Sequence, residues 1–203
     1  HFTGTPLQVK ATWAALKQLP TVVSAEALLC TVFMKWCWRF RCFQGWLVSF
    51  PVLRGTWEGT LQATWSDPVT GKTPGPIPMI LVIRQTFLHI SCTMHTQEMS
   101  SASYSASFLV DPDNGSNKLV YTYMSRPEVG IRDRSRIHDG TALLGIVTDP
   151  TRRLVGEYWT NRNTTGAINL TYKSSKLLQQ FPGGKAQSAG KRKRMLGSGG
   201  SAQ

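Results

Sequence analysis

A change in hydrophobic periodicity after Arg54 is the feature that most constrains the fold of this chain. From there, apolar and polar side chains alternate over short segments, of which residues 56–65 are the clearest. A period of two is typical of a strand that buries one face. Turn-forming sequences at residues 111–115 and 148–152 separate successive segments. The pattern therefore predicts antiparallel strands joined by loops.

Seven or eight such strands follow one another along the chain. An up-and-down order leaves two exposed edges unless the first strand pairs with the last one. Closing the sheet into a barrel removes both edges. We therefore predict a mainly β fold, a small up-and-down antiparallel β-barrel of about eight strands, preceded by an N-terminal helix or helices. The last hairpin, residues 154–172, would then close the barrel.

Composition divides the chain into three parts. We predict a helical, membrane-associated segment in residues 1–53, the β-barrel, ligand-sensing domain in residues 54–176, and a disordered basic tail in residues 177–203. The net charge of +12 belongs mainly to the ends, because residues 54–176 hold thirteen basic and ten acidic side chains. This distribution argues against a nucleic acid duplex as partner and favours flanks that meet an anionic membrane surface.

The N-terminal part combines an apolar stretch with a segment rich in aromatic and basic side chains. The apolar stretch, residues 16–34, includes Glu26 and is near the ~20 residues that a membrane-spanning helix needs. The aromatic and basic residues 35–46 are typical of a membrane interface on the cytoplasmic side. We expect membrane association with the barrel in the cytoplasm. A helix packed on the barrel is the alternative.

The sequence shows no catalytic or metal-binding pattern. It contains no Gly-x-Ser-x-Gly, no phosphate-binding Gly-rich loop and no His-Glu-x-x-His. The four cysteines include no Cys-x-x-Cys pair, and His89 and His95, six residues apart on one strand, would lie too far apart to share a metal. We therefore expect a binding protein and not an enzyme, with no metal and no cofactor.

The middle of the chain is rich in side chains that bind phosphates and bases. Arginine makes bidentate contacts to phosphate, and tyrosine stacks on bases or fills a core. Filling of the lumen by the aromatic rings, with solvated arginines, is an equally good interpretation of the pattern. Alternation places Tyr158, Thr160 and Arg162 on one face, which we expect to point inward. The predicted ligand-binding residues are Tyr158, Thr160, Arg162, Arg84, Tyr121, Tyr123, Arg136 and Thr141.

Several short motifs occur in a fixed order between residues 46 and 173. They are FPVLRGTWEG at residues 50–59, IRQT at 83–86, the alternating serines of 101–107, LVYTY at 119–123, HDGT at 138–141, GEYWTNR at 156–162, and Gly166. In this combination and order they resemble the SMODS-associated, two-transmembrane, β-strand-rich effectors of bacterial CBASS antiphage defence.

The resemblance implies an eight-stranded barrel sensor behind N-terminal helices in the bacterial inner membrane. It implies that the barrel binds a cyclic dinucleotide made by a partner nucleotidyltransferase during infection. Ligand binding would drive homo-oligomerisation and disruption of the inner membrane, which leads to abortive infection. The family has two N-terminal membrane helices, whereas this sequence offers at most one convincing span.

A lipocalin-like barrel that carries an apolar small ligand is the alternative function. The up-and-down strand order and the tripeptide Trp57-Glu58-Gly59 in the first strand are compatible with it. The arginines among residues 132–136 are less so, because an apolar ligand offers them no anionic partner.

Overall fold

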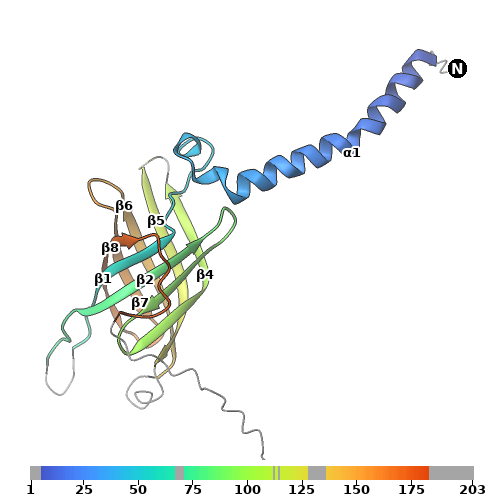
Figure 1. Ribbon diagram of the computed structural model, residues 1–203. Coiled ribbons are helices and arrows are strands. Elements are labelled where there is room, and N and C mark those ends of the chain that lie inside the picture. The colour runs from blue at the N-terminus through green and yellow to red at the C-terminus, as the bar shows by residue number, and fades with distance from the viewer. Residues whose placement is uncertain (1–5, 67–70, 112, 114, 128–135, 183–203) are drawn as a thin grey trace, which may run out of the picture.

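The chain forms a closed eight-stranded barrel preceded by a long helix (Figure 1). This computed structural model describes residues 6–66, 71–111, 113, 115–127 and 136–182. Helix α1 spans Pro6–Lys35, and the 3₁₀ helices η1 (Cys37–Arg39) and η2 (Arg41–Phe43) follow it. The strands are β1 (Gly55–Ala63), β2 (Ile77–Gln85), β3 (Ile90–His95), β4 (Met99–Asp111), β5 (Ser116–Pro127), β6 (His138–Val147), β7 (Arg153–Thr160) and β8 (Thr165–Ser174).

The strands follow one another around the barrel in chain order. Each pairs antiparallel with the next, and β1 pairs with β8 to complete the ring. The predicted up-and-down barrel with a preceding helix is therefore confirmed. The sequence left residues 79–96 as two strands or as one long bent strand. They belong to two strands, because a turn in which Thr86 donates its N–H to the carbonyl of His89 separates β2 from β3.

Two inward-facing glycines allow neighbouring strands to approach closely. A Cβ atom on Gly59 of β1 would lie 1.9 Å from the carbonyl oxygen of Asn169 on β8. A Cβ atom on Gly156 of β7 would lie 1.9 Å from the carbonyl oxygen of Leu143 on β6. No side chain fits at either distance, which explains glycine at both positions.

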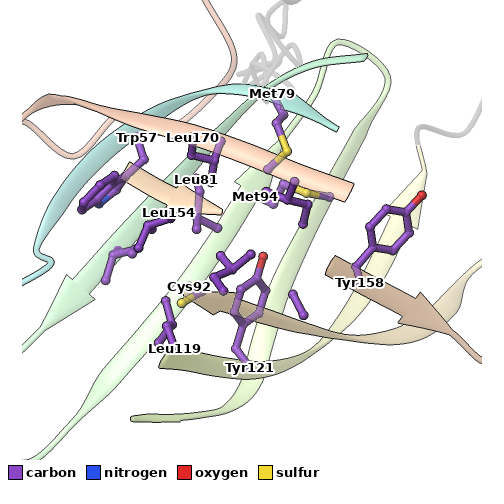
Figure 2. Close-up of a cluster of buried hydrophobic side chains, with 14 of the residues drawn as sticks. Trp57, Met79, Leu81, Cys92, Met94, Leu119, Tyr121, Leu154, Tyr158 and Leu170 are labelled. Atoms are coloured by element: carbon purple, nitrogen blue, oxygen red, sulfur yellow. The ribbon is translucent and has the colours of Figure 1, made fainter. Parts of the chain in front are cut away.

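Apolar side chains fill most of the barrel interior. Leu81, Leu119 and Leu154, from three different strands, are fully buried in one continuous cluster. Burial of each such side chain stabilises the fold by about 1.5–3 kcal/mol. Figure 2 shows Trp57 at one end of this cluster and Tyr158 at the other. The two ends of the barrel interior therefore carry different chemistry.

The end of the barrel nearest α1, which we call the helix end, is closed by residues 51–53, the plug segment. Gln85 of β2 is only 3% exposed, and its amide bonds this segment from both sides. Its Oε1 accepts from the N–H of Leu53 at 2.7 Å, and its Nε2 donates to the carbonyl of Pro51 at 3.0 Å. Trp57 Nε1 donates to the carbonyl of Leu53 at 2.9 Å. These bonds fix the plug segment across the interior.

Aromatic side chains join α1 to the helix end. Phe33 of α1 lies 5.5 Å from Phe87 between ring centroids, in the turn between β2 and β3. Phe50 lies 5.9 Å from Phe87 and stacks on Phe108 of β4 at 5.4 Å. The contact is confined to the last turns of the helix, and Figure 1 shows the rest of α1 extending away from the barrel. Within the described residues, α1 therefore meets the barrel at its last turns and does not lie along it.

The part of α1 that extends from the barrel exposes apolar side chains. Val22, Val23, Leu28 and Leu29 are between 50% and 68% exposed. Among the residues that the structure describes, no helix is both long enough and apolar enough to cross a bilayer. Exposed leucine and valine side chains at this density are unusual for a surface helix and indicate a contact surface.

The chain that follows β8 crosses the outer face of β1 and β2 (Figure 1). Thr56 of β1 donates its hydroxyl to the carbonyl of Lys176 at 2.6 Å, and accepts from the N–H of Leu178 at 3.3 Å. On this side of the sheet, Ile80 and Val82 point outward from β2 and are nevertheless fully buried. The segment after β8 therefore belongs to the folded domain.

The strands lie close to the predicted limits of the barrel domain. They extend from Gly55 to Ser174, against the predicted range of 54–176. The predicted helical part, residues 1–53, also contains a non-helical stretch at residues 44–53. Of the tail predicted to be disordered, residues 177–182 follow β8 along the barrel, whereas residues 183–203 lie outside the described residues.

Replacement of Gln85 by alanine is expected to lower the free energy of unfolding by about 1–3 kcal/mol, because it leaves two backbone groups of the plug segment without their partner. Urea unfolding of the full chain, followed by tryptophan fluorescence, measures this loss. Gln97→Ala, at an exposed position between β3 and β4, is the matched control and is expected to stay within about 0.5 kcal/mol of the parent. Equal losses in both variants would contradict the role of Gln85.

Candidate functional site

Polar side chains face the interior at the end of the barrel remote from α1, which we call the far end. There β5 and β7 end, and β6 and β8 begin. In the register of the sheet, Tyr123 and Thr160 lie on either side of Gly140, and Tyr158 lies beside Gly166. All three polar side chains are less than 9% exposed. The far end therefore has hydroxyl groups where the middle of the barrel has leucines.

The two tyrosine rings at the far end lie over glycines of neighbouring strands. A Cβ atom on Gly140 would lie 2.6 Å from Cζ and from the hydroxyl oxygen of Tyr123. A Cβ atom on Gly166 would lie 2.5 Å from Cε1 of Tyr158. Each ring thus occupies space that a side chain on the next strand would fill. The glycines set the inclination of both rings and hence the direction of their hydroxyls.

Two buried hydroxyls inside the barrel have no hydrogen-bond partner among the described residues. They are the phenol oxygen of Tyr121 and Oγ of Ser101. Figure 2 shows the Tyr121 hydroxyl directed into the interior. Ser101 pairs in register with Ser125, whose Oγ donates to Sδ of Met99 at 3.1 Å. An unpaired buried hydroxyl costs about 1–3 kcal/mol, so such groups are characteristic of positions that bind water or a ligand.

Burial keeps the interior phenols protonated. It raises the pKa of Tyr158, and it raises the pKa of Tyr123 together with a smaller contribution from the nearby phenol of Tyr158. Burial also raises the pKa of Tyr121 well above its usual value. Folding therefore favours the neutral phenols, and the stability linked to them is lost only as the pH rises above ~10. At neutral pH all three hydroxyls are available as hydrogen-bond donors.

Thr160 shapes the turn that joins β7 to β8. Its hydroxyl lies 2.6 Å from that of Thr164 and accepts from the N–H of Arg162 at 3.2 Å. Asn163 in the same turn has a φ of 56°, in the left-handed region that asparagine tolerates. The hydroxyl of Thr160 is thus engaged in the turn. It positions the backbone of Arg162, whose side chain is exposed at the far end.

Of the eight predicted site residues, four face the barrel interior and two are exposed at the far end. Tyr158 and Thr160 face inward on β7 as expected, and Tyr123 and Tyr121 face inward on β5, with Tyr121 nearer the middle of the barrel. Arg162 and Arg136 are exposed in the chain segments next to β8 and β6 at the far end, so Arg162 does not share the buried position of Tyr158 and Thr160.

The other two predicted residues, Arg84 and Thr141, point away from the interior. Arg84 is an exposed residue near the helix end of β2, between the inward-facing Ile83 and Gln85. Thr141 lines a pocket of about 280 Å³ on the outer face, together with residues such as Trp159. Parity along a strand fixes these directions, because neighbours of an inward residue must point outward. Arg132 and Arg134, the other loop arginines considered, lie outside the described residues.

The alternating serines of β4 do not lie on one face, as their spacing suggested. A bulge between Ser103 and Ser105 changes the register with β5, so that Ser103 is opposite Tyr123 and Ser105 is opposite Thr122. Ser101 and Ser103 therefore face inward, whereas Ser105 faces outward. A β-bulge inserts one unpaired residue, which strict alternation does not reveal. Ser101 was not among the predicted site residues.

Comparison with known proteins identifies the domain. A protein-family model described as "Cap15, cyclic dinucleotide receptor domain" matches residues 48–172, which include seven complete strands and most of β8. The chain belongs to this family. "CD-NTase-associated protein 15" of Staphylococcus schleiferi is 26% identical over 148 residues, 73% of this chain and 75% of that protein. The protein of the same name from Escherichia albertii is 24% identical over 163 residues, 77% of this chain and 80% of that protein.

Membership of this family confirms the resemblance to CBASS effectors that the ordered motifs indicated. The barrel is accordingly a cyclic dinucleotide receptor domain of a CBASS effector. A receptor domain needs a site with polar groups that are not already paired within the protein. The unpaired hydroxyls and neutral phenols inside this barrel supply such groups.

Replacement of Gly140 by alanine is expected to lower the free energy of unfolding by about 1–3 kcal/mol, since the new methyl group displaces the Tyr123 ring. Urea unfolding of the full chain measures the loss, and near-ultraviolet circular dichroism reports the movement of the tyrosine. Gly75→Ala is the control, because a Cβ atom there meets nothing within 4 Å. An unchanged tyrosine signal in Gly140→Ala would contradict the proposed packing.

Proposed function

We propose that this chain is a CBASS effector whose barrel binds a cyclic dinucleotide at the far end. The observation that carries the proposal is the set of inward-facing hydroxyls in a domain of the cyclic dinucleotide receptor family. The names of the two relatives support pairing with a cyclic-oligonucleotide-producing nucleotidyltransferase. We place the ligand at the far end because the plug segment closes the interior at the helix end.

A cyclic dinucleotide combines two phosphodiester groups with two aromatic bases. Neutral phenols suit such a dianion, because each hydroxyl donates a hydrogen bond without adding negative charge. Tyr123 and Tyr158 are in this state, and their rings offer surfaces on which a base stacks. Arg162 and Arg136 are exposed at the same end and extend the site with two guanidinium groups. We assign the bases to the rings and the phosphates to the hydroxyls and arginines.

The lipocalin-like alternative remains a separate outcome of the same experiments. It requires that an apolar ligand occupy the barrel, and mass spectrometry of the purified protein detects such a ligand directly. The unpaired hydroxyls of Tyr121 and Ser101 favour the nucleotide, since an apolar ligand leaves both without a partner.

A cyclic dinucleotide is expected to raise the melting temperature of the full chain, because a ligand that binds only the folded state stabilises it. A panel of cyclic dinucleotides with different bases and linkages is titrated and followed by differential scanning fluorimetry. Tyr158→Phe is expected to weaken binding about tenfold, since it removes one hydrogen bond to a charged group.

Tyr104→Phe is the matched control for this variant. Tyr104 is 64% exposed on the outer face of β4, so loss of its hydroxyl is expected to leave the affinity unchanged. Absence of a shift with every member of the panel would refute cyclic dinucleotide binding. Equal affinity of Tyr158→Phe and the parent would refute the far-end site. Light scattering during the same titration reports whether the ligand drives homo-oligomerisation.

We further propose that the chain acts at the bacterial inner membrane, with the barrel in the cytoplasm, and that ligand-driven oligomerisation disrupts that membrane. Exposed apolar side chains on α1 support this location. So do Trp36, Phe40 and Trp46, which are 58%, 57% and 72% exposed beside basic residues of the segment after α1. Exposed tryptophan next to lysine and arginine is characteristic of a membrane interface.

The double variant Phe40→Ser/Trp46→Ser is expected to bind vesicles more weakly than the parent, because it removes two aromatic side chains that would enter the interface. Flotation with vesicles of phosphatidylethanolamine and phosphatidylglycerol measures the bound fraction. Trp65→Ser, which alters an aromatic residue that is 46% exposed beyond the far end of β1, is the control and is expected to float like the parent. Equal flotation of the double variant would exclude this surface as the membrane contact.

A further inference from the structure

A second pocket lies at the helix end, opposite the far-end site. It has a volume of about 410 Å³ and is formed by the segment after α1, the plug segment, and the chain between β6 and β7. Three arginines, Arg39, Arg41 and Arg152, line it together with Gln44 and Thr148. The lining contains no aspartate and no glutamate. The pocket therefore collects hydrogen-bond donors and positive charge.

The guanidinium of Arg152 is fixed in orientation by its neighbours. It lies 4.2 Å from the ring centroid of Tyr172 and 5.3 Å from that of Trp57, and it donates one hydrogen bond to the carbonyl of Val52 at 2.5 Å. Arginine has five N–H donors, and no other hydrogen bond of this guanidinium occurs among the described residues. A preorganised guanidinium with free donors is suited to planar contact with an oxyanion.

The three arginines have no counter-charge within the described part of the chain. The carboxylate of Glu58 does not serve this pocket, because it forms an ion pair with Lys173 on the outer face of β1 and β8. Arg39 instead lies over the ring of Trp38, 5.3 Å from its centroid. Three like charges around one pocket repel one another, and an anion bound between them would relieve that repulsion. This charge distribution is the basis for asking which anion fits the pocket.

We propose that this pocket binds a phosphate ester, at a site separate from the cyclic dinucleotide site. Phosphate is the anion that best matches several arginines, because its oxygens accept bidentate hydrogen bonds from each of them. Two sources carry this group: the headgroup of an anionic phospholipid and a soluble nucleotide. The exposed rings of Phe40 and Trp46 belong to the same segment as Arg39 and Arg41, so the pocket lies next to the proposed membrane contact.

Soluble probes test the site without a membrane. The full chain in nonionic detergent is titrated calorimetrically with glycerophosphoglycerol, the water-soluble headgroup of phosphatidylglycerol, and separately with inorganic phosphate and with AMP. At least one probe is expected to bind. The double variant Arg39→Gln/Arg41→Gln is expected to weaken the binding of that probe about tenfold or more, because it removes charge-assisted hydrogen bonds. Arg152→Gln is expected to do the same. Because Arg152 also stacks on Trp57 and Tyr172, the Arg39/Arg41 variant provides the decisive measurement.

Arg153→Gln is the control for loss of one positive charge and matches Arg152→Gln. Arg153 is the exposed neighbour of Arg152 and does not line the pocket, so its replacement is expected to leave binding of the probe unchanged. Vesicles of phosphatidylglycerol and of phosphatidylcholine then separate the two sources. Selective loss of phosphatidylglycerol binding in the Arg39/Arg41 variant identifies the headgroup, whereas binding of AMP with unchanged vesicle binding identifies a soluble phosphate.

Three results would overturn the proposal. One is failure of every soluble probe to bind at millimolar concentration. Another is equal weakening by Arg153→Gln and by the Arg39/Arg41 variant, which would reduce the effect to general surface charge. The third is loss of the response to the cyclic dinucleotide in the Arg39/Arg41 variant, which would make this pocket the dinucleotide site itself. The far-end site is tested separately by the affinity of Tyr158→Phe for the cyclic dinucleotide, because that variant leaves the arginine pocket unchanged.

Discussion

Pairing of the first strand with the last is the interaction on which the rest of the structure depends. It joins β1 and β8 along the barrel, and it brings the backbone of β8 at Asn169 too close to Gly59 for any side chain at that glycine. Closure encloses an interior that alternating side chains fill, and it removes both sheet edges. It also places the chain after β8 on the outer face of β1, where Thr56 bonds to Lys176.

The closed barrel has two chemically different ends. At the helix end, Gln85 and Trp57 fix the plug segment by hydrogen bonds, and Arg152 stacks beside them. At the far end, tyrosine rings over glycines hold hydroxyl groups in the interior. Between the two ends lies a cluster of leucine side chains with Tyr121, whose hydroxyl has no hydrogen-bond partner within the described part of the chain. A ligand bound at the proposed far-end site would contact this core, and the plug segment packs against the other end of the same core.

The sequence predicted much of the site because strand parity is a local property. Alternation along β7 was sufficient to put Tyr158 and Thr160 on one face, and the structure has that face inward. The same rule did not extend to Arg84 and Thr141, which were chosen for their chemistry without regard to parity and point outward. Nor did it reveal that the serines of β4 lie on two faces, since the bulge between Ser103 and Ser105 changes the face within the strand.

The sequence by itself determined the strands, their order and the family, because periodicity, turn residues and ordered motifs are encoded within short stretches of chain. Tertiary structure alone decided which groups meet. Arg152 joins Arg39 and Arg41 at one pocket although more than a hundred positions separate them in the sequence. Gly140 makes room for Tyr123 only because β5 and β6 are paired in one particular register. Contacts of this kind depend on the register and arrangement of the strands in space, which no local pattern specifies.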